Sequence, residues 1–238
     1  MVRSPGLFAL RHHLGMVRPL ILGARRGACR SWSQHGEDAK IVQELETCLA
    51  RGFYVDVGAN HPARISNTYR LYCKGMRGVC IEPNEIFCGL HAKYRPGDIA
   101  MCIAVGARAG LAKYYQMSQH GFSTFSDEQC RRYQEDGVAL LRESYKPAFP
   151  LSTVLEQCRL PNRDVFALLS VDVEGWDEVV LRSNDWRRFR PRLVVVEYNE
   201  REAATSTTRF LEEQDYEKIG TFGCNGMFAD RSARRDRS

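Results

Sequence analysis

Apolar residues are distributed along the chain in two patterns that alternate with each other. Short, almost continuous apolar runs are typical of strands buried on both faces of a sheet, and they predict strands at 53–57, 77–84, 98–106, 166–175 and 191–199. Segments with apolar residues at helical spacing lie between and beside them, at 33–52, 66–75, 85–94, 176–183 and 208–216. The alternation predicts an α/β fold with a mostly parallel sheet.

Two of the predicted helices carry start or stop signals. In the first, four aliphatic residues between positions 41 and 49 share one face, and Gly52 marks the end. The second begins with a cap at Ser66 or Asn67 and stops at Gly75.

The region from 110 to 150 interrupts the alternation. Residues 110–117 fit a strand, 121–126 fit a polar loop, and 127–144 are irregular or helical. After the last predicted helix, the two runs within 217–230 predict a terminal β-hairpin.

The net charge of +5 is concentrated at the two ends of the chain. Residues 1–30 contain six arginines and no acid, and the last residues are also rich in arginine, so the part between them is mildly acidic. A nucleic-acid-binding domain would instead carry its basic residues on the folded part. We expect one domain at 31–230, a flexible basic leader at 1–30, a basic tail at 231–238, and no nucleic-acid partner.

The leader and the cysteines bear on the compartment. The leader shares its composition with organellar transit peptides, but Arg and Pro break its apolar runs, so we expect a basic extension and not a secretory signal. No stretch has the ~20 apolar residues of a membrane span, and the nine cysteines form no C-x-x-C pair. We expect a reduced cytoplasmic protein without stable membrane insertion.

Acidic residues stand at the ends of four predicted strands. They are Asp56, Glu82, Asp172 with Glu174, and Glu197 followed by Asn199. In parallel sheets ligands bind at the carboxyl ends of the strands, close to the point where the strand order reverses. Buried strands need no acids at one common end, so this set indicates a binding site.

The turn after the first of these strands narrows the class of ligand. Gly58 permits a tight turn or a close approach to a ligand, and Glu82 stands where nucleotide-binding α/β folds keep the acid that binds ribose hydroxyls. The G-x-G-x-x-G fingerprint of dinucleotide sites is absent, which leaves little room for a pyrophosphate. A nucleoside with a small charged tail fits better, and S-adenosylmethionine is such a ligand.

Seven segments, in this order, carry a family resemblance: SQHGED, GFYVDVGANHP, SNTYRLY, GVCIEPN, IAVG, GFSTFS and SVDVEGWDEVVL. Together they resemble the FkbM family of S-adenosylmethionine-dependent methyltransferases over residues 31–229. The resemblance implies a single Rossmann-like class I methyltransferase domain, with a mostly parallel seven-stranded sheet, helices on both faces and an antiparallel last strand. It also implies O-methylation of a hydroxyl group on a saccharide or small-molecule acceptor.

The resemblance places the cofactor along the first three strand ends. Asp56, Gly58 and Asn60 would border its methionine part, and Glu82 would bind its ribose. The other cofactor residues implied are Ala59, Pro83 and Asn84, and, along the adenine, Ala104 and Val105. His61 and Pro62 replace the glycine that many relatives carry after this loop, so its shape departs from the family pattern.

Methyl transfer to an alcohol needs a group that accepts the hydroxyl proton. Asp172, Glu174 and His61 are the predicted catalytic residues, and His120 is a further candidate. Asp172 and Glu174 alternate along one strand, so only one is expected to face the acceptor unless the chain turns at Gly175. An alternative role for Glu174 is to place its charge at the start of the next helix.

A metal ion is the other way to acidify a hydroxyl. Asp172, Glu174, Glu197 and Asn199 offer hard oxygen ligands that suit Mg²⁺, but acids at strand ends also cap helices and accept hydrogen bonds. We predict no resident metal. The sequence leaves open the need for a divalent ion, the general base, the acceptor, the role of the leader and the oligomeric state.

Two further contacts and two other functions complete the prediction. The loop 121–126 and Gln34 are predicted to cover the cofactor and acceptor. One alternative function is a non-catalytic cofactor-binding protein of the same fold. The other is a nucleotide-cofactor oxidoreductase, which the missing glycine fingerprint disfavours.

Overall fold

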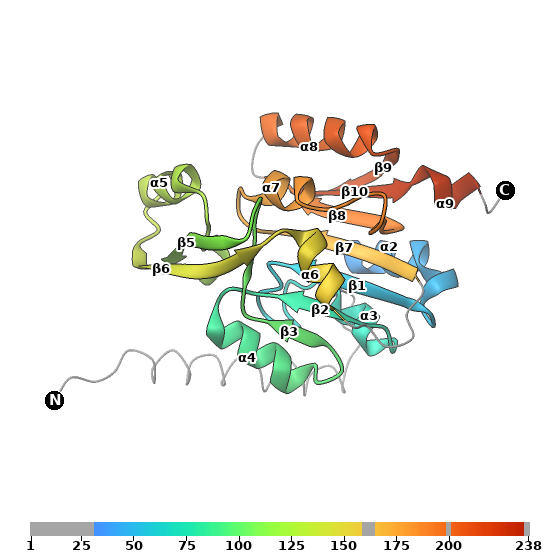
Figure 1. Cartoon of the computed structure of the whole chain (residues 1–238), viewed down its shortest axis with the longest axis horizontal. Helices are drawn as coiled ribbons and strands as arrows, with labels where there is room; N and C mark the ends of the chain where they lie inside the picture. Colours follow the sequence, from blue (N-terminus) through green and yellow to red (C-terminus); the bar gives the residue numbers. More distant parts are fainter. Residues whose placement is uncertain (1–30, 159–164, 199–200, 236–238) are drawn as a thin grey trace.

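A seven-stranded sheet forms the centre of the computed structural model, which describes residues 31–158, 165–198 and 201–235 (Figure 1). Its strand order is β3-β2-β1-β7-β8-β10-β9. The strands are β1 (Gly52–Val57), β2 (Arg77–Ile81), β3 (Ile99–Met101), β7 (Val165–Val171), β8 (Leu193–Glu197), β9 (Tyr216–Phe222) and β10 (Asn225–Asp230). Neighbouring strands are parallel except where β10 pairs antiparallel with β8 and β9. The predicted mostly parallel sheet with an antiparallel last strand is confirmed.

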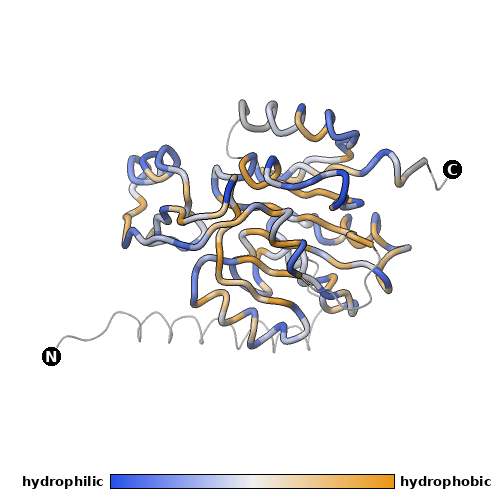
Figure 2. The backbone as a smooth tube through the Cα atoms, in the orientation of Figure 1, coloured by the Kyte–Doolittle hydropathy of each residue, from blue (hydrophilic) through white to orange (hydrophobic). Residues whose placement is uncertain are grey.

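Both faces of the sheet are buried. Side chains alternate between the two faces along each strand, and helices pack against both. On β8, Val194 and Val196 belong to one hydrophobic cluster, and Leu193 and Val195 belong to the other. The first cluster takes helix side chains from α6 (Leu151–Gln157), α7 (Asp177–Arg182) and α8 (Arg201–Glu213), and the second from α2 (Glu37–Glu44) and α3 (Tyr69–Cys73). Figure 2 shows hydrophobic residues gathered on the central strands.

The helix predicted at 33–52 is shorter in the structure. It consists of α2 and a 3₁₀ turn, η1 (Glu46–Cys48), and Gly52 is the first residue of β1 and not a helix end. A Cβ atom at Gly52 would lie 2.7 Å from the Cys48 carbonyl oxygen and 2.8 Å from the Ala167 Cβ. Close packing of β1, and not a helix stop, therefore requires this glycine.

The second helix begins slightly later than predicted. Thr68, and not Ser66 or Asn67, occupies the cap position of α3. Ser66 still contributes, because its Oγ accepts a hydrogen bond from the Tyr69 N–H at 3.2 Å. The helix ends before Gly75, whose φ of +93° favours glycine.

The helix predicted at 85–94 is present with the same bounds. α4 spans Glu85–Tyr94, and the Asn84 side chain caps it by accepting a hydrogen bond from the Ile86 N–H at 3.0 Å. Glu82 and Pro83 directly precede this cap, so the helix is tied to the carboxyl end of β2.

The single strand predicted at 98–106 is wrong. The chain forms β3 in the main sheet and then β4 (Ala104–Val105) in a second sheet of order β4-β6-β5. The other elements of this insertion are β5 (Gly110–Met117), η2 (His120–Phe122), α5 (Asp127–Glu135) and β6 (Leu140–Phe149). β5, β6 and α5 lie together at one side of the main sheet (Figure 1).

The remaining predictions concern the ends of the chain. The predicted terminal hairpin is present as β9 and β10, and α9 (Arg231–Arg235) follows it within the predicted tail. The predicted leader and Asn199 lie outside the described residues. Within the described ranges, no helix combines the length and hydrophobicity needed to cross a membrane.

Candidate active site

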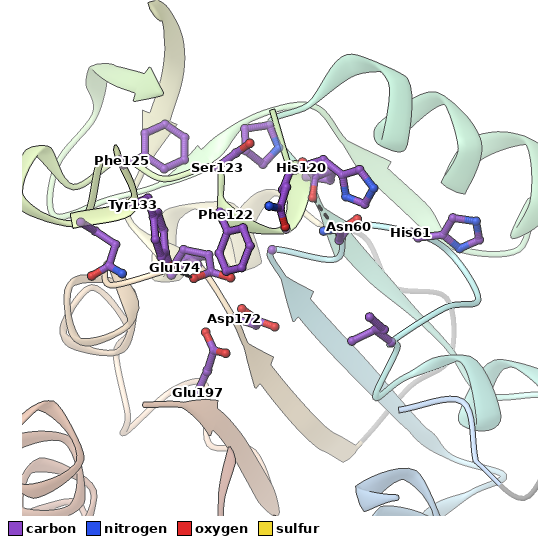
Figure 3. Close-up of a pocket in the computed structure, with 18 of the residues that line it drawn as sticks. Asn60, His61, His120, Phe122, Ser123, Phe125, Tyr133, Asp172, Glu174 and Glu197 are labelled. Carbon is purple, nitrogen blue, oxygen red and sulfur yellow. Dashed lines mark hydrogen bonds between the residues drawn. The ribbon is translucent and has the colours of Figure 1, made fainter. Parts of the chain in front are cut away.

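A cavity of about 860 Å³ lies at the carboxyl ends of the central strands (Figure 3). Its walls include the turn after β1, Glu82 after β2, Asp172 and Glu174 after β7, and Glu197 at the end of β8. The strand order reverses between β1 and β7, which is where ligands bind in open α/β sheets. The topology thus brings acids from three strand ends to one cavity.

Gly58 sets the shape of the turn after β1. Its φ is +81°, and a Cβ atom here would lie 1.7 Å from the backbone oxygen of Asp172. Only glycine lets the turn pass this close to the end of β7. Two residues later, Asn60 also has a left-handed backbone, with φ of +43°, so the turn curves sharply along the cavity.

Glu82 connects this turn to the start of α4. Its Oε2 accepts the Asn60 N–H at 2.8 Å, and its Oε1 accepts the Asn84 N–H at 2.7 Å. Burial raises the pKa of Glu82 to about 7, against the two backbone hydrogen bonds. Since a carboxylate oxygen accepts more than one hydrogen bond, both oxygens keep capacity for the two hydroxyls of a ribose.

Three carboxylates form a cluster on the opposite side of the turn. Oxygens of Asp172, Glu174 and Glu197 all lie within 4.8 Å of one another, as Figure 3 shows. Burial raises the pKa of all three, and mutual repulsion adds to the rise for Glu174 and Glu197. Like charges this close are stable only with bound protons or a cation, so the cluster suits either proton transfer or a divalent ion.

Glu174 reaches the cavity because the chain turns after β7. Its φ is +54°, its carbonyl accepts the Thr124 Oγ1–H at 2.7 Å, and its carboxylate accepts a hydrogen bond from the Tyr133 hydroxyl. β7 ends at Val171, so strand alternation no longer separates Asp172 from Glu174, and both line the cavity. The turn anticipated near Gly175 is therefore present.

At the start of α7, the place considered for the charge of Glu174, the first residue is Asp177. Its two carboxylate oxygens accept the N–H groups of Val173 and Gly175, both at 3.1 Å. Burial raises the pKa of Asp177 to about 7. Asp177 closes the turn that leads into α7 and leaves Glu174 directed at the cavity.

The predicted cofactor residues separate into two groups. Gly58, Asn60, Glu82 and Pro83 line the cavity. The others are not among the described residues that line it: Asp56, Ala59, Asn84, Ala104 and Val105. Of these, Asp56 is buried and accepts a hydrogen bond from the Thr68 hydroxyl at 2.5 Å.

Ala104 lies behind the residues that line the cavity. It packs in a cluster with Tyr114, Phe125 and Ala148, and the two aromatic residues are cavity walls. Val105 belongs to the main core. The segment predicted to lie along an adenine therefore supports the aromatic wall from behind.

His61 lines the cavity but lies apart from the acids. Its Nδ1 accepts the N–H groups of Ala63 and Arg64 at 3.1 and 3.0 Å, so it closes its own turn. In Figure 3 its ring lies beyond Asn60, on the side away from Asp172. His120 also lines the cavity, with its ring against the edge of Phe87.

The insertion supplies a wall that the sequence did not identify. Three α5 residues and the residue that caps its end line the cavity: Gln129, Arg132, Tyr133 and Asp136. Their spacing of three, four and seven positions places them on one face of the helix, and this periodicity was the available signal. The predicted loop contacts Phe122, Ser123 and Phe125, and Gln34 before α2, also line the cavity.

The SQHGED segment has a second, structural role. Asp38 is fully buried, accepts the Trp32 N–H at 2.9 Å and pairs with Arg70 at 3.1 Å. Glu37 accepts a hydrogen bond from the Asn225 side chain at 2.6 Å. These acids fasten the start of the domain to α3 and β10, which holds Gln34 at the cavity.

Strand order, the antiparallel β10 and the cavity at the β1–β7 switch point define a Rossmann-like class I methyltransferase fold. The family described as "Methyltransferase FkbM domain" matches residues 56–218. The chain belongs to this family and is a methyltransferase.

Two of the solved structures that match this chain are named as methyltransferases. One is a candidate O-methyltransferase from Klebsiella pneumoniae, with 12% identity and a TM-score of 0.40 over 96% of this chain and 90% of that one. Another is the O-methyltransferase from Bacillus cereus in complex with SAH, with 9% identity and a TM-score of 0.38 over the same shares. A comparison with curated protein sequences finds no match.

Proposed function

We propose that this protein is an S-adenosylmethionine-dependent O-methyltransferase that acts on a hydroxyl of a saccharide or another small metabolite. The observation that carries the proposal is that Glu82 and the cluster of Asp172, Glu174 and Glu197 line one cavity, on two sides of the Gly58 turn. One acid suits a ribose, and the cluster suits an acceptor hydroxyl. The mildly acidic body of the chain supports a small acceptor over a nucleic acid, and the proposed compartment is the cytoplasm.

Two buried polar atoms belong to residues that line the cavity, and they support a polar ligand beside them. Asn60 Oδ1 and Glu197 Oε2 have no hydrogen-bond partner within the described ranges. Buried polar atoms of this kind are costly unless a ligand or water pairs with them. Asn60 lies on the side of Glu82, where the amino-acid tail of the cofactor would bind, and Glu197 lies on the side of the acceptor.

The proposed roles follow from this division. When bound, S-adenosylmethionine supplies a methyl group on a sulfonium, a good leaving group. Glu82 binds the ribose, the 58–60 turn and the aromatic walls orient the ligand, and the insertion excludes water. Asp172 or Glu174 accepts the proton of the attacking hydroxyl as the new C–O bond forms and the C–S bond breaks. We propose no catalytic role for His61, because its ring lies apart from the acids.

Calorimetric titration tests the cofactor directly. We expect S-adenosylmethionine and S-adenosylhomocysteine to bind the purified protein with one site per chain, because both carry the ribose and the amino-acid tail that the cavity suits. NAD is the comparison ligand for the oxidoreductase alternative. Tighter binding of NAD than of either sulfur ligand would overturn the proposal.

A further inference from the structure

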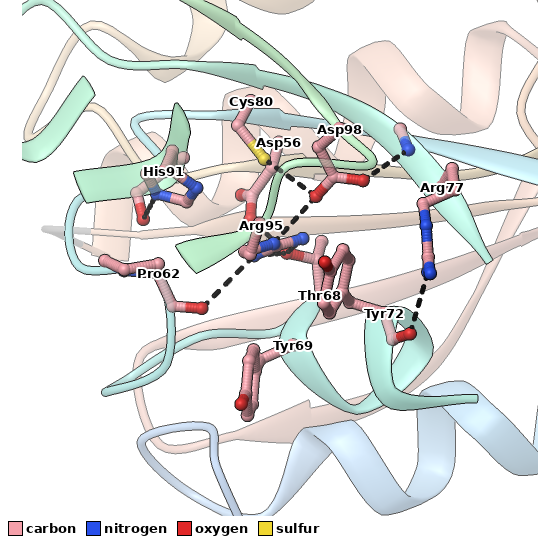
Figure 4. Close-up of polar contacts among 12 residues, drawn as sticks. Asp56, Pro62, Thr68, Tyr69, Tyr72, Arg77, Cys80, His91, Arg95 and Asp98 are labelled. Atoms are coloured by element: carbon pink, nitrogen blue, oxygen red, sulfur yellow. Dashed lines mark hydrogen bonds and ion pairs between the residues drawn. The ribbon is translucent and has the colours of Figure 1, made fainter. Parts of the chain in front are cut away.

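His91 on α4 and Arg95, just after the helix, hold the 58–62 turn. His91 Nε2 lies 3.0 Å from the carbonyl oxygen of Asn60 and 3.3 Å from that of Ala59. Arg95, one helical turn later, donates from Nη1 to the carbonyl oxygen of Pro62 at 3.4 Å. Figure 4 shows both side chains directed at this turn. Three carbonyl groups of the turn, those of Ala59, Asn60 and Pro62, are thus held by these two side chains.

His91 can serve this role only as a hydrogen-bond donor. It is 1% exposed, and burial together with the charge of Arg95 lowers its pKa to about 3, so the ring is neutral at physiological pH. Because carbonyl oxygens only accept hydrogen bonds, the proton must be on Nε2. Nδ1 has no hydrogen-bond partner among the described residues, which agrees with this tautomer.

The Arg95 side chain that contacts the turn is itself held in place by several partners. Its guanidinium is fully buried, pairs with Asp98 at 2.7 Å and donates to the Tyr54 hydroxyl at 2.6 Å. It also donates to Thr68 Oγ1 at 3.1 Å, and Thr68 in turn donates to Asp56. The charge of Arg95 is therefore compensated, and its position is fixed by β1, α3 and the end of α4 together.

The turn is also held at the N-terminal end of α4. Glu82, just before α4, accepts the Asn60 N–H and the Asn84 N–H. Asn60 therefore has its N–H bound at the start of α4 and its carbonyl bound two turns further on. A non-glycine residue with φ of +43° is strained, and these two hydrogen bonds hold it in that conformation.

We propose that His91 is a positioning residue for the cofactor: its Nε2–H holds the carbonyl groups of Ala59 and Asn60, so that Asn60 faces the amino-acid tail of the ligand. The inference rests on the proposed function, since it assumes that this turn binds that tail. It predicts that α4 couples the ribose part of the pocket, through Glu82, to the methionine part, through His91.

Titration of three variants with two ligands tests the proposal. His91→Leu keeps apolar volume but loses the donor, His91→Gln restores an N–H near the position of Nε2, and Leu90→Val is a control on the same helix. S-adenosylhomocysteine carries the amino-acid tail, and 5′-methylthioadenosine lacks it. We expect His91→Leu to weaken S-adenosylhomocysteine binding ~10-fold, about 1.4 kcal/mol, and 5′-methylthioadenosine binding less than ~2-fold.

The conservative variant and the control should behave differently. His91→Gln should recover S-adenosylhomocysteine binding to within ~3-fold of wild type, and Leu90→Val should leave the affinity of both ligands unchanged. Equal losses for the two ligands, or no loss in folded His91→Leu, would overturn the proposal. If His91→Leu does not fold, His91→Asn, whose amide is one methylene too short to reach the carbonyls, replaces it in the comparison with His91→Gln.

Hydrogen exchange separates this inference from the proposed function. In the absence of ligand, the peptide that covers residues 58–62 should exchange faster in His91→Leu than in wild type or Leu90→Val. Failure of the wild type to bind S-adenosylhomocysteine would reject the proposed function, whereas unchanged exchange of this peptide in His91→Leu would reject the support of the turn by His91.

Discussion

At the end of β7, Asp172 and Glu174 are two residues apart, yet both side chains reach the same cavity. The backbone at Glu174 turns left-handed, and the insertion fixes this turn through Thr124 and Tyr133. Strain of this kind persists only where surrounding contacts hold it, and it concentrates at functional sites. The geometry therefore supports the proposed role of Glu174 beside an acceptor hydroxyl.

Amide substitutions test the two acids. Asp172→Asn and Glu174→Gln keep the shape and the hydrogen-bonding capacity of the side chains but remove the negative charge. For the residue that accepts the proton, we expect turnover to fall by ~10² to 10⁴ with the affinity for S-adenosylhomocysteine nearly unchanged. Transfer of radiolabelled methyl to a saccharide extract measures turnover, and Glu178→Gln on α7 is the control.

Chelation distinguishes a proton acceptor from a metal ligand at the same cluster. If the three carboxylates hold a divalent ion, EDTA lowers wild-type turnover and Mg²⁺ restores it. Full activity of both amide variants, together with insensitivity to EDTA, would exclude this pair from catalysis and make His120, which also lines the cavity, the next residue to test.

At the scale of elements, the position of the β1 turn against the end of β7 determines whether the cavity forms. Gly58 and Gly75 have similar φ angles, +81° and +93°, but only Gly58 has backbone atoms in the place of a Cβ. A Cβ atom added at Gly75 would meet nothing within 4 Å. Comparing an alanine substitution at each position therefore separates two costs: the left-handed backbone conformation, which both share, and the steric clash of the new Cβ, which only Gly58 has.

We predict that Gly58→Ala lowers the free energy of unfolding by about 3 kcal/mol or more, because the new Cβ forces β1 and β7 apart. Gly75→Ala, the matched control, should lower it by only ~1 kcal/mol, the cost of the left-handed conformation alone. Chemical denaturation measures both. Equal losses in the two variants would show that the contact with Asp172 adds nothing.

At the scale of the whole molecule, burial raises the pKa of several carboxyl groups in the pocket. The free energy of unfolding therefore depends on pH. Burial, reinforced by the charges of Asp56 and Asp172, raises the pKa of Glu82 from 4.5 to about 7. The folded state therefore binds a proton more tightly than the unfolded state. Its stabilising contribution is complete below the unfolded pKa and is lost as the pH rises through the folded pKa.

We predict that the ligand-free protein loses about 2 to 3 kcal/mol of unfolding free energy from Glu82 between about pH 5 and pH 8. Glu82→Gln, which cannot titrate, should lack this part of the pH dependence. Urea denaturation of both proteins across this range measures the difference. A wild-type advantage over Glu82→Gln that grows with pH would show that the folded-state pKa is lowered and would contradict the prediction.

Local patterns in the sequence determined the order of most strands and helices outside residues 118–157, the acids at the strand ends and the family. These follow from burial and turn chemistry within single segments, which the residues of each segment report directly. The prediction at 98–106 failed because β3 and β4 are both apolar, so nothing in the run marks the point where the chain leaves one sheet for the other.

Only the tertiary structure decided which residues meet. Glu197 joins Asp172 because β8 is the neighbour of β7, α5 becomes a cavity wall because the insertion folds back over the strand ends, and Asp56 turns away toward Thr68 and Arg95. His91 and the turn that it supports are about thirty positions apart in the sequence. No local pattern reports a contact over such a separation. Contacts of this kind depend on the packing of whole elements, whereas periodicity records only the face that each element buries.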